Sequence, residues 1–262
     1  MPERPLDVDV RQSFRDIFLT KNEYKLVDDF VIRDGNTHPV ALLVPGGGYG
    51  MVCSFIEGVP IARKLNEKGI SAFILYYHVR NKAEYPAPMD DLARAVREIM
   101  EKKEVYNIDF EDYSIWGASA GGHLAASFGT DNVGYVKYGL PKPAALILAY
   151  PVISMDLDIT HGGSHDNLLG KKASPEKEEM LSVEKHVHSG YPDTYLWCSL
   201  ADKVVDPLNS RRMARALAEK GIRYQLRIFD DTAHGVGPGT GTNAEGWIDE
   251  AIRFWLMEES IR

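Results

Sequence analysis

The chain has 262 residues, of which 44% are hydrophobic and 26% charged, and its formal net charge is −8 at pH 7. These shares are ordinary for a globular protein and exclude a collagen-like, coiled-coil or disordered chain. An acidic chain without a run of Lys and Arg argues against a nucleic acid as partner. No stretch approaches ~18 consecutive apolar residues, so we expect no membrane span.

The two cysteines, Cys53 and Cys198, lie far apart in the sequence and form no C-x-x-C pair. Buried free thiols are typical of a reducing compartment. The N-terminal segment Met1–Asp9 carries charges and prolines rather than an apolar core, so we expect no secretory signal. The predicted location is therefore cytoplasmic.

In chain order, Tyr24–Arg33 is predicted to add an antiparallel strand at the start. Six later apolar runs have the continuous hydrophobic pattern of strands buried on both faces. They are Val40–Val44, Ile70–Tyr77, Tyr113–Trp116, Ala144–Tyr150, Tyr195–Cys198 and Tyr224–Phe229.

Helical patterns alternate with these strands, with apolar residues stepping by three and four. They cover Ile56–Lys68, Met89–Met100, His123–Phe128, Leu208–Lys220 and Trp247–Leu256. Strand–helix alternation predicts an α/β protein with a mostly parallel central sheet and helices on both faces. We expect a single domain over 1–262, with its active site at the carboxyl ends of the strands.

One segment, residues 152–192, breaks this alternation. It has no clear strand, is rich in Gly, His, Ser and Lys, and contains a short helical pattern at Pro175–Leu181. Inserts of this length in a compact domain are often lids or binding loops. We therefore expect it to line or cover the active site.

The strongest chemical signal is the sequence Gly-Ala-Ser-Ala-Gly at 117–121, directly after a predicted strand and before a helix. It matches the G-x-S-x-G motif, in which a sharp turn exposes the serine hydroxyl. Larger side chains two positions on either side of the serine would collide with neighbouring backbone. We therefore predict that Ser119 is a nucleophile.

A serine nucleophile needs a base that is held by an acid. His234 follows the last predicted strand, where the base of this chain order falls, and Asp202 follows the strand before it. Asp206 is a rival acid, although its position before Pro207 also fits a helix cap. Asp156 and Asp158 are weaker candidates.

The remaining histidines have weaker claims to a reactive role. His123 lies on the helix behind the serine and is expected to be packed. His161, His165, His186 and His188 cluster in the insert, but no cysteine or H-E-x-x-H pattern supports a metal site. We predict no metal.

The glycine-rich segment Pro45–Gly50 follows the strand Val40–Val44 and is the predicted oxyanion hole. Backbone N–H groups stabilise the charge that develops on a carbonyl oxygen, and glycines let the backbone approach it. We expect the N–H groups of Gly47, Gly48 and Ala120 to supply this stabilisation. The glycine spacing does not fit a nucleotide-binding loop.

Six segments of the chain, taken in order, resemble the α/β-hydrolase serine esterases. They are PGGGYG, YPAPMDDLARAVR, GASAGGHLAA, HGGSHDNLLG, ADKVVDPLNS and AHG. More narrowly, they are similar to the bacterial acetyl esterase and acetyl-xylan-esterase-like group. The resemblance implies an α/β-hydrolase fold, a Ser119–Asp202–His234 triad and oxyanion glycines within Gly46–Gly48. Two departures are Pro45, where the lipase pattern has His, and Asp206, where relatives often have Pro.

The resulting hypothesis is a carboxylic ester hydrolase without a cofactor that works through an acyl-enzyme. Since no large cap domain or apolar lid helix is expected, we predict a short-acyl ester, with an acetylated sugar as the substrate that the family resemblance favours. A formamidase-type amide hydrolase with the same triad is the alternative. A catalytically silent binding protein is disfavoured because no triad member is missing, and a homodimer is left open.

Overall fold

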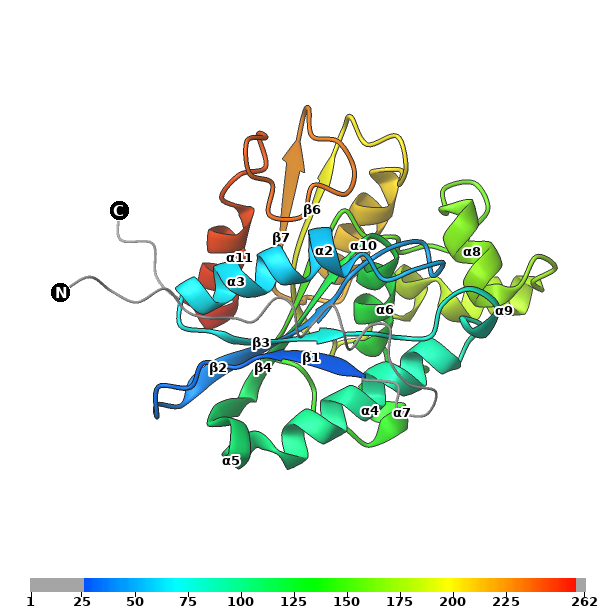
Figure 1. The fold of residues 1–262 in the computed structure, drawn as a ribbon. Helices are drawn as coiled ribbons and strands as arrows, with labels where there is room; N and C mark the ends of the chain where they lie inside the picture. Colours follow the sequence, from blue (N-terminus) through cyan, green and yellow to red (C-terminus); the bar gives the residue numbers. More distant parts are fainter. Residues whose placement is uncertain (1–25, 258–262) are drawn as a thin grey trace.

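A seven-stranded sheet runs through the computed structural model, which describes residues 26–257 (Figure 1). Its strand order is β1-β3-β2-β4-β5-β6-β7. The strands are β1 Val27–Phe30, β2 His38–Val44, β3 Ser71–Leu75, β4 Ile108–Ala118, β5 Ala145–Ala149, β6 Asp193–Ser199 and β7 Tyr224–Phe229. β1 pairs antiparallel with β3, and all the other pairs are parallel. This arrangement confirms the predicted sheet.

Helices connect the strands. The longer ones are α3 Val59–Glu67, α4 Ala87–Glu101, α6 Ser119–Phe128, α8 Gly162–Leu169, α10 Leu208–Glu219 and α11 Trp247–Leu256. The shorter ones are α2 Ser54–Glu57, α5 Lys103–Tyr106, α7 Tyr135–Tyr138, α9 Pro175–Leu181 and the 3-10 helices η1 Arg80–Lys82 and η2 Val183–His186. No large cap domain is present among residues 26–257, and none of the helices described there is long and apolar enough to cross a bilayer.

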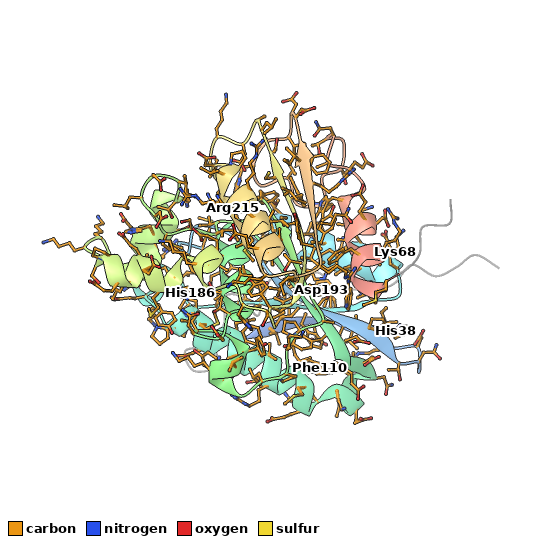
Figure 2. All side chains as sticks on the ribbon, turned by 180° about the vertical axis from the view of Figure 1, so that it is seen from behind. His38, Lys68, Phe110, His186, Asp193 and Arg215 are labelled. Atoms are coloured by element: carbon orange, nitrogen blue, oxygen red, sulfur yellow. The ribbon has the colours of Figure 1, made fainter. Side chains whose placement is uncertain are left out.

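Two apolar cores lie on opposite faces of the sheet, because successive side chains of a strand point to opposite faces. In β2, Val40, Leu42 and Val44 join the core formed with α4, α6 and α10, whereas Ala41 and Leu43 join the core formed with α3 and α11. Figure 1 shows α3 across the near face, and Figure 2, seen from behind, shows α10 with Arg215 across the other. The predicted helices on both faces are confirmed.

The observed elements differ locally from the predicted ones; β4, for example, begins at Ile108 rather than at Tyr113. The first strand is observed over Val27–Phe30, and residues 24 and 25 of the expected strand lie outside the described part. The insert carries α8 in addition to the expected helix Pro175–Leu181. The expected helix Ile56–Lys68 is interrupted at Gly58, since Pro60 has no N–H to donate to the carbonyl of Ile56.

The sheet topology decides where the predicted site residues meet. The strand order reverses direction between β2 and β4, which lie side by side although β3 comes between them in the chain. Such a switch point leaves a crevice at the carboxyl ends of the strands. The glycine loop follows β2, Ser119 follows β4, Asp202 follows β6 and His234 follows β7.

Candidate active site

Ser119 occupies the sharp turn between β4 and α6. Its φ is +54°, in the left-handed region that side chains other than glycine rarely adopt. This backbone conformation is the strained strand-to-helix turn that the G-x-S-x-G motif requires. The side chain stands at the first residue of α6, where the partial positive charge of the helix end favours negative charge.

The two outer glycines of the motif allow the close approach that the sequence predicted. A Cβ atom on Gly117 would lie 2.4 Å from the carbonyl oxygen of Gly121, and one on Gly121 would lie 2.0 Å from that of Val44. Real Cβ atoms do not approach oxygen so closely. The turn therefore depends on glycine at both positions.

The structure brings Ser119, His234 and Asp202 together in one hydrogen-bonded series. Ser119 Oγ lies 2.9 Å from His234 Nε2, and His234 Nδ1 lies 2.6 Å from Asp202 Oδ2. The imidazole also packs against the ring of Tyr150, with centroids 4.7 Å apart. A serine hydroxyl next to an imidazole that a carboxylate orients can be activated as a nucleophile.

Asp202 is held in its ionised form. Burial opposes ionisation, but the bond to His234 and the N–H groups of Val205 and Val204 outweigh it, so the pKa of this carboxyl lies below its usual value. Those two N–H groups donate to Oδ1 over 3.0 and 2.8 Å, which leaves Oδ2 for the imidazole. The side chain is only 2% exposed, so its charge is poorly screened by water.

The rival acids lie in other environments. Asp206 Oδ1 accepts from the N–H of Leu208, the first residue of α10, over 2.8 Å. Asp156 pairs with Lys185 and Arg212, and Asp158 pairs with Arg212. None of these three carboxylates has a hydrogen bond to an imidazole among the residues described.

The predicted oxyanion glycines lie beside the serine. A Cβ on Gly46 would stand 2.6 Å from Ser119 Cβ, so only glycine lets this loop pass so close to the turn. Gly47 and Gly48 have φ values of +122° and +63°, which glycine adopts without strain. Ala120 is the second residue of α6, so its N–H has no acceptor within the helix.

The insert reaches this loop through α8. Asn167 Nδ2 donates to the carbonyl oxygen of Gly48 over 2.9 Å, and a Cβ on Gly48 would lie 3.2 Å from His161 Cε1. Nδ1 of His161 accepts from the N–H of Ser164, so the neutral ring carries its proton on Nε2. Burial and the nearby charge of His234 lower the pKa of His161.

The other histidines of the insert point elsewhere. His165 pairs with Asp166 and Glu178, His186 binds the carbonyl of Glu179, and His188 binds that of Gly129. Figure 2 labels His186, which lies in η2. Over residues 26–257, no three His, Cys, Asp or Glu side chains are grouped as metal ligands would be.

His123 is packed, as predicted. It is 1% exposed, its Nδ1 accepts from the Tyr49 hydroxyl over 2.8 Å, and its Nε2 donates to the carbonyl of Leu181 over 2.8 Å. Burial lowers its pKa to about 4, so the ring is neutral near pH 7. It joins the glycine loop to the end of α9.

The sequence did not predict a site role for Glu57, because a glutamate outside every motif is typical of a solvated face. The structure buries it to 5% exposure directly beneath the glycine loop. Its spacing carries a signal, since Ile61 and Leu65, four and eight residues later, are the buried stripe of α3. Glu57 therefore belongs to the buried face.

The fold and the site together define an α/β-hydrolase. The structure is similar to the acetyl ester-xyloside bifunctional hydrolase of Caldicellulosiruptor lactoaceticus, with a TM-score of 0.81 and 31% identity over 93% of this chain and 92% of that one. It is also similar in fold to the carboxylesterase Cest-2923 of Lactobacillus plantarum WCFS1, with a TM-score of 0.76 and 21% identity over 88% and 92% of the two chains.

The chain belongs to the BD-FAE family, whose model matches residues 32–217. Among curated proteins, it is 35% identical over 96% of its length to the endo-1,4-beta-xylanase B of Butyrivibrio fibrisolvens and 31% identical over 84% to the acetylxylan esterase of Xylanibacter ruminicola. The chain spans 42% and 46% of the lengths of these two relatives. The predicted resemblance to α/β-hydrolase esterases is confirmed, and the esterases among these relatives agree with the expected enzyme class.

Proposed function

We propose that the protein is a carboxylic ester hydrolase that works through an acyl-enzyme. The observation that carries the proposal is the hydrogen-bonded series from Ser119 to His234 to Asp202. Ser119 Oγ attacks the ester carbonyl while His234 Nε2 takes its proton, and His234 then returns that proton to the leaving alcohol. Water then attacks the carbonyl of the acyl-enzyme while His234 takes a proton from it. His234 returns this proton to Ser119 Oγ as the carboxylic acid leaves. Asp202 orients the ring and stabilises the imidazolium.

The oxyanion of each tetrahedral intermediate binds the backbone. In this proposal the N–H of Ala120 and those of Gly47 and Gly48 converge on that oxygen, next to the positive end of α6. Two observations support this arrangement: Gly46 packs closely against Ser119, and Gly47 and Gly48 have positive φ values. Preorganised donors of this kind are worth about 10²–10³-fold in kcat each.

The substrate is a short-acyl ester of a carbohydrate alcohol. Support comes from the names of two relatives, an acetylxylan esterase and an acetyl ester-xyloside hydrolase. Further support comes from the polar side of the site, where the insert 152–192 places His161 and Asn167 next to Gly48. A small acyl group needs no apolar cover, whereas the leaving sugar needs hydrogen-bond partners.

An acyl-chain panel tests this function. We expect p-nitrophenyl acetate to be hydrolysed at least about 10-fold faster than the octanoate, and acetate to be released from acetylated xylo-oligosaccharides. Ser119→Ala should abolish both activities and labelling by a fluorophosphonate probe. Equal rates on the two esters would contradict the short-acyl claim, and full activity in Ser119→Ala would contradict the mechanism.

Amide hydrolysis of the formamidase type is not favoured, since the relatives named above are esterases, a xylanase and an ester-xyloside hydrolase. Turnover of N-formylkynurenine faster than of acetylated xylo-oligosaccharides would reverse this preference. The cytoplasmic location, the single domain over 1–262 and a homodimer stay predictions.

A further inference from the structure

Glu57 connects the two loops on which the proposed mechanism depends. Its Oε2 accepts from the N–H of Gly46 over 2.7 Å, and its Oε1 accepts from the hydroxyl of Tyr150 over 2.9 Å. The Tyr150 oxygen in turn accepts from the N–H of Gly237 over 3.2 Å. One carboxylate therefore joins the glycine loop after β2 to the loop that carries His234.

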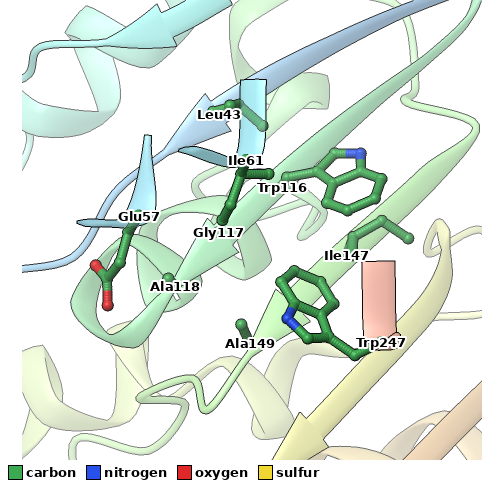
Figure 3. Close-up of a pocket in the computed structure, with 9 residues that line it drawn as sticks. All are labelled: Leu43, Glu57, Ile61, Trp116, Gly117, Ala118, Ile147, Ala149 and Trp247. Carbon is green, nitrogen blue, oxygen red and sulfur yellow. The ribbon is translucent and has the colours of Figure 1, made fainter. Parts of the chain in front are cut away.

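One side of Glu57 faces apolar groups. Glu57 lines a small cavity of about 10 Å³ together with Gly117 and Ala118, at the end of β4, and Figure 3 shows the residues around it. The other side chains that line the cavity are aliphatic or indole groups, from Leu43, Ile61, Trp116, Ile147, Ala149 and Trp247. A charge in such a place acts on its neighbours with little screening.

The hydrogen bonds show which form of Glu57 the site holds. Both oxygens of Glu57 accept, one from the N–H of Gly46 and the other from the hydroxyl of Tyr150. This is the pattern of an ionised carboxylate. Burial raises the pKa of Glu57, while the Gly46 N–H, the Tyr150 hydroxyl and the charge of His234 oppose that increase.

The positive charge that interacts with the Glu57 carboxylate is that of His234. The other titratable groups around Glu57 are Cys53, Tyr77 and Tyr150, and burial raises the pKa of each, so all three are neutral near pH 7. Around His234 itself, Asp202 is anionic and His161 is held neutral by burial. Glu57 and Asp202 thus place two negative charges near one imidazole.

We propose that Glu57 is a positioning residue of this active site, which holds the oxyanion loop and the His234 loop in register and places a negative charge near His234. This inference rests on the proposed esterase function. In the reaction, the proton that leaves Ser119 resides on His234 while the tetrahedral intermediate forms. The buried negative charge of Glu57, which interacts with the charge of His234, stabilises that state, and the bond to Gly46 keeps the oxyanion donors in place.

The test is the pH profile of kcat/KM for p-nitrophenyl acetate in Glu57→Gln, which keeps the shape and removes the charge. The acid limb reports ionisation of the base in the free enzyme. Without the charge, protonation of His234 is less favourable, so we expect the acid limb to move to lower pH by about 0.5–1 unit. We expect kcat on the plateau to fall about 10- to 100-fold, since Gln has one acceptor oxygen and cannot accept from both Gly46 and Tyr150.

Glu184→Gln is the matched control. Glu184 is also a buried glutamate whose pKa burial raises, but it lies in η2 and faces Ser154 and Arg212 rather than the site. The acid limb of the pH profile and the kcat of Glu184→Gln should equal those of wild type. An unshifted acid limb in Glu57→Gln, or a shift of the same size in Glu184→Gln, would overturn the inference.

Two further measurements keep the test decisive. If circular dichroism shows that Glu57→Gln is unfolded, Tyr150→Phe takes its place. This variant keeps the Glu57 carboxylate and removes the hydroxyl that links it to Gly237, so we expect kcat to fall several-fold. A wild-type kcat in Tyr150→Phe would reject the inference. A wild type without esterase activity would reject the proposed function and the inference with it. An active wild type with an unchanged Glu57→Gln profile rejects the inference alone.

Discussion

Asn167 in the insert and Gly48 in the glycine loop are 119 residues apart and are joined by a hydrogen bond of 2.9 Å. The bond orients the peptide between Gly48 and Tyr49, whose residues both have positive φ. A carbonyl that is fixed in this way also fixes the neighbouring N–H groups. The insert therefore helps to set the geometry of the proposed oxyanion hole.

Asn167→Asp should weaken catalysis through this contact. A carboxylate facing the Gly48 carbonyl repels it, so we expect kcat/KM for p-nitrophenyl acetate to fall about 10-fold. Asn132→Asp is the control, because Asn132 also donates to a carbonyl, that of Met180, over 3.0 Å. The control should lose about 1 kcal/mol of stability and no activity. Equal activity in the two variants would contradict the role of Asn167.

Substitutions of Asp202 and Asp206 should have clearly different effects on activity. Asp202→Asn removes the charge that orients His234, so we expect kcat to fall about 10³- to 10⁴-fold with little change in fold. Asp206→Asn retains an oxygen that can accept from the N–H of Leu208, so both its activity and its melting temperature should stay near those of wild type. Steady-state kinetics on the same ester decide between them. Greater loss in Asp206→Asn would mean that the acid has been misassigned.

His123 should make stability depend on pH. Its pKa is about 4 in the folded protein and near its ordinary value of 6.5 in the unfolded chain. The unfolded state therefore binds more protons between these values, and the contribution to stability that is complete above pH 6.5 is lost as the pH falls through 4. The loss amounts to about 3 kcal/mol.

Urea denaturation of wild type and His123→Gln at pH 7 and pH 4.5 measures this contribution. We expect the variant to be less stable at pH 7 but to lose less stability on acidification, since Gln does not titrate. Other groups contribute equally to both proteins and cancel in the comparison. Identical losses in the two proteins would show that His123 is not the group responsible.

The glycines of the serine turn should be irreplaceable for steric reasons. Gly121→Ala places a Cβ 2.0 Å from the carbonyl oxygen of Val44, so we expect a loss of more than about 2 kcal/mol or no folded protein. Gly162→Ala is the control, because that position in α8 has no atom within 4 Å of an added Cβ. Alanine there should raise the melting temperature slightly. Similar melting temperatures would refute the packing argument.

Much of the fold could be predicted from local patterns. The strand Tyr224–Phe229 and the helix Trp247–Leu256 are observed with the expected bounds, because their apolar spacing matches a single period throughout. The helix Pro175–Leu181 also has the expected bounds, since Ser174 caps it and Pro175 fits its first turn. α8 escaped prediction because its apolar positions are few and its residues Gly162 and Gly163 are poor helix formers. The break at Gly58 escaped prediction because Ile56 lies at helical spacing from Val59 in α3.

The sequence by itself determined which residues could do chemistry: a serine between two glycines, a histidine before the last helix, and an aspartate after a strand. These carry local signals, since a tight turn or a strand end restricts the residue types that fit. Only the tertiary structure decided which of them meet and what lies beneath them. Glu57, Tyr150 and Asn167 act through contacts 11 to 119 residues away, and such pairings depend on strand order and burial, which local spacing does not encode.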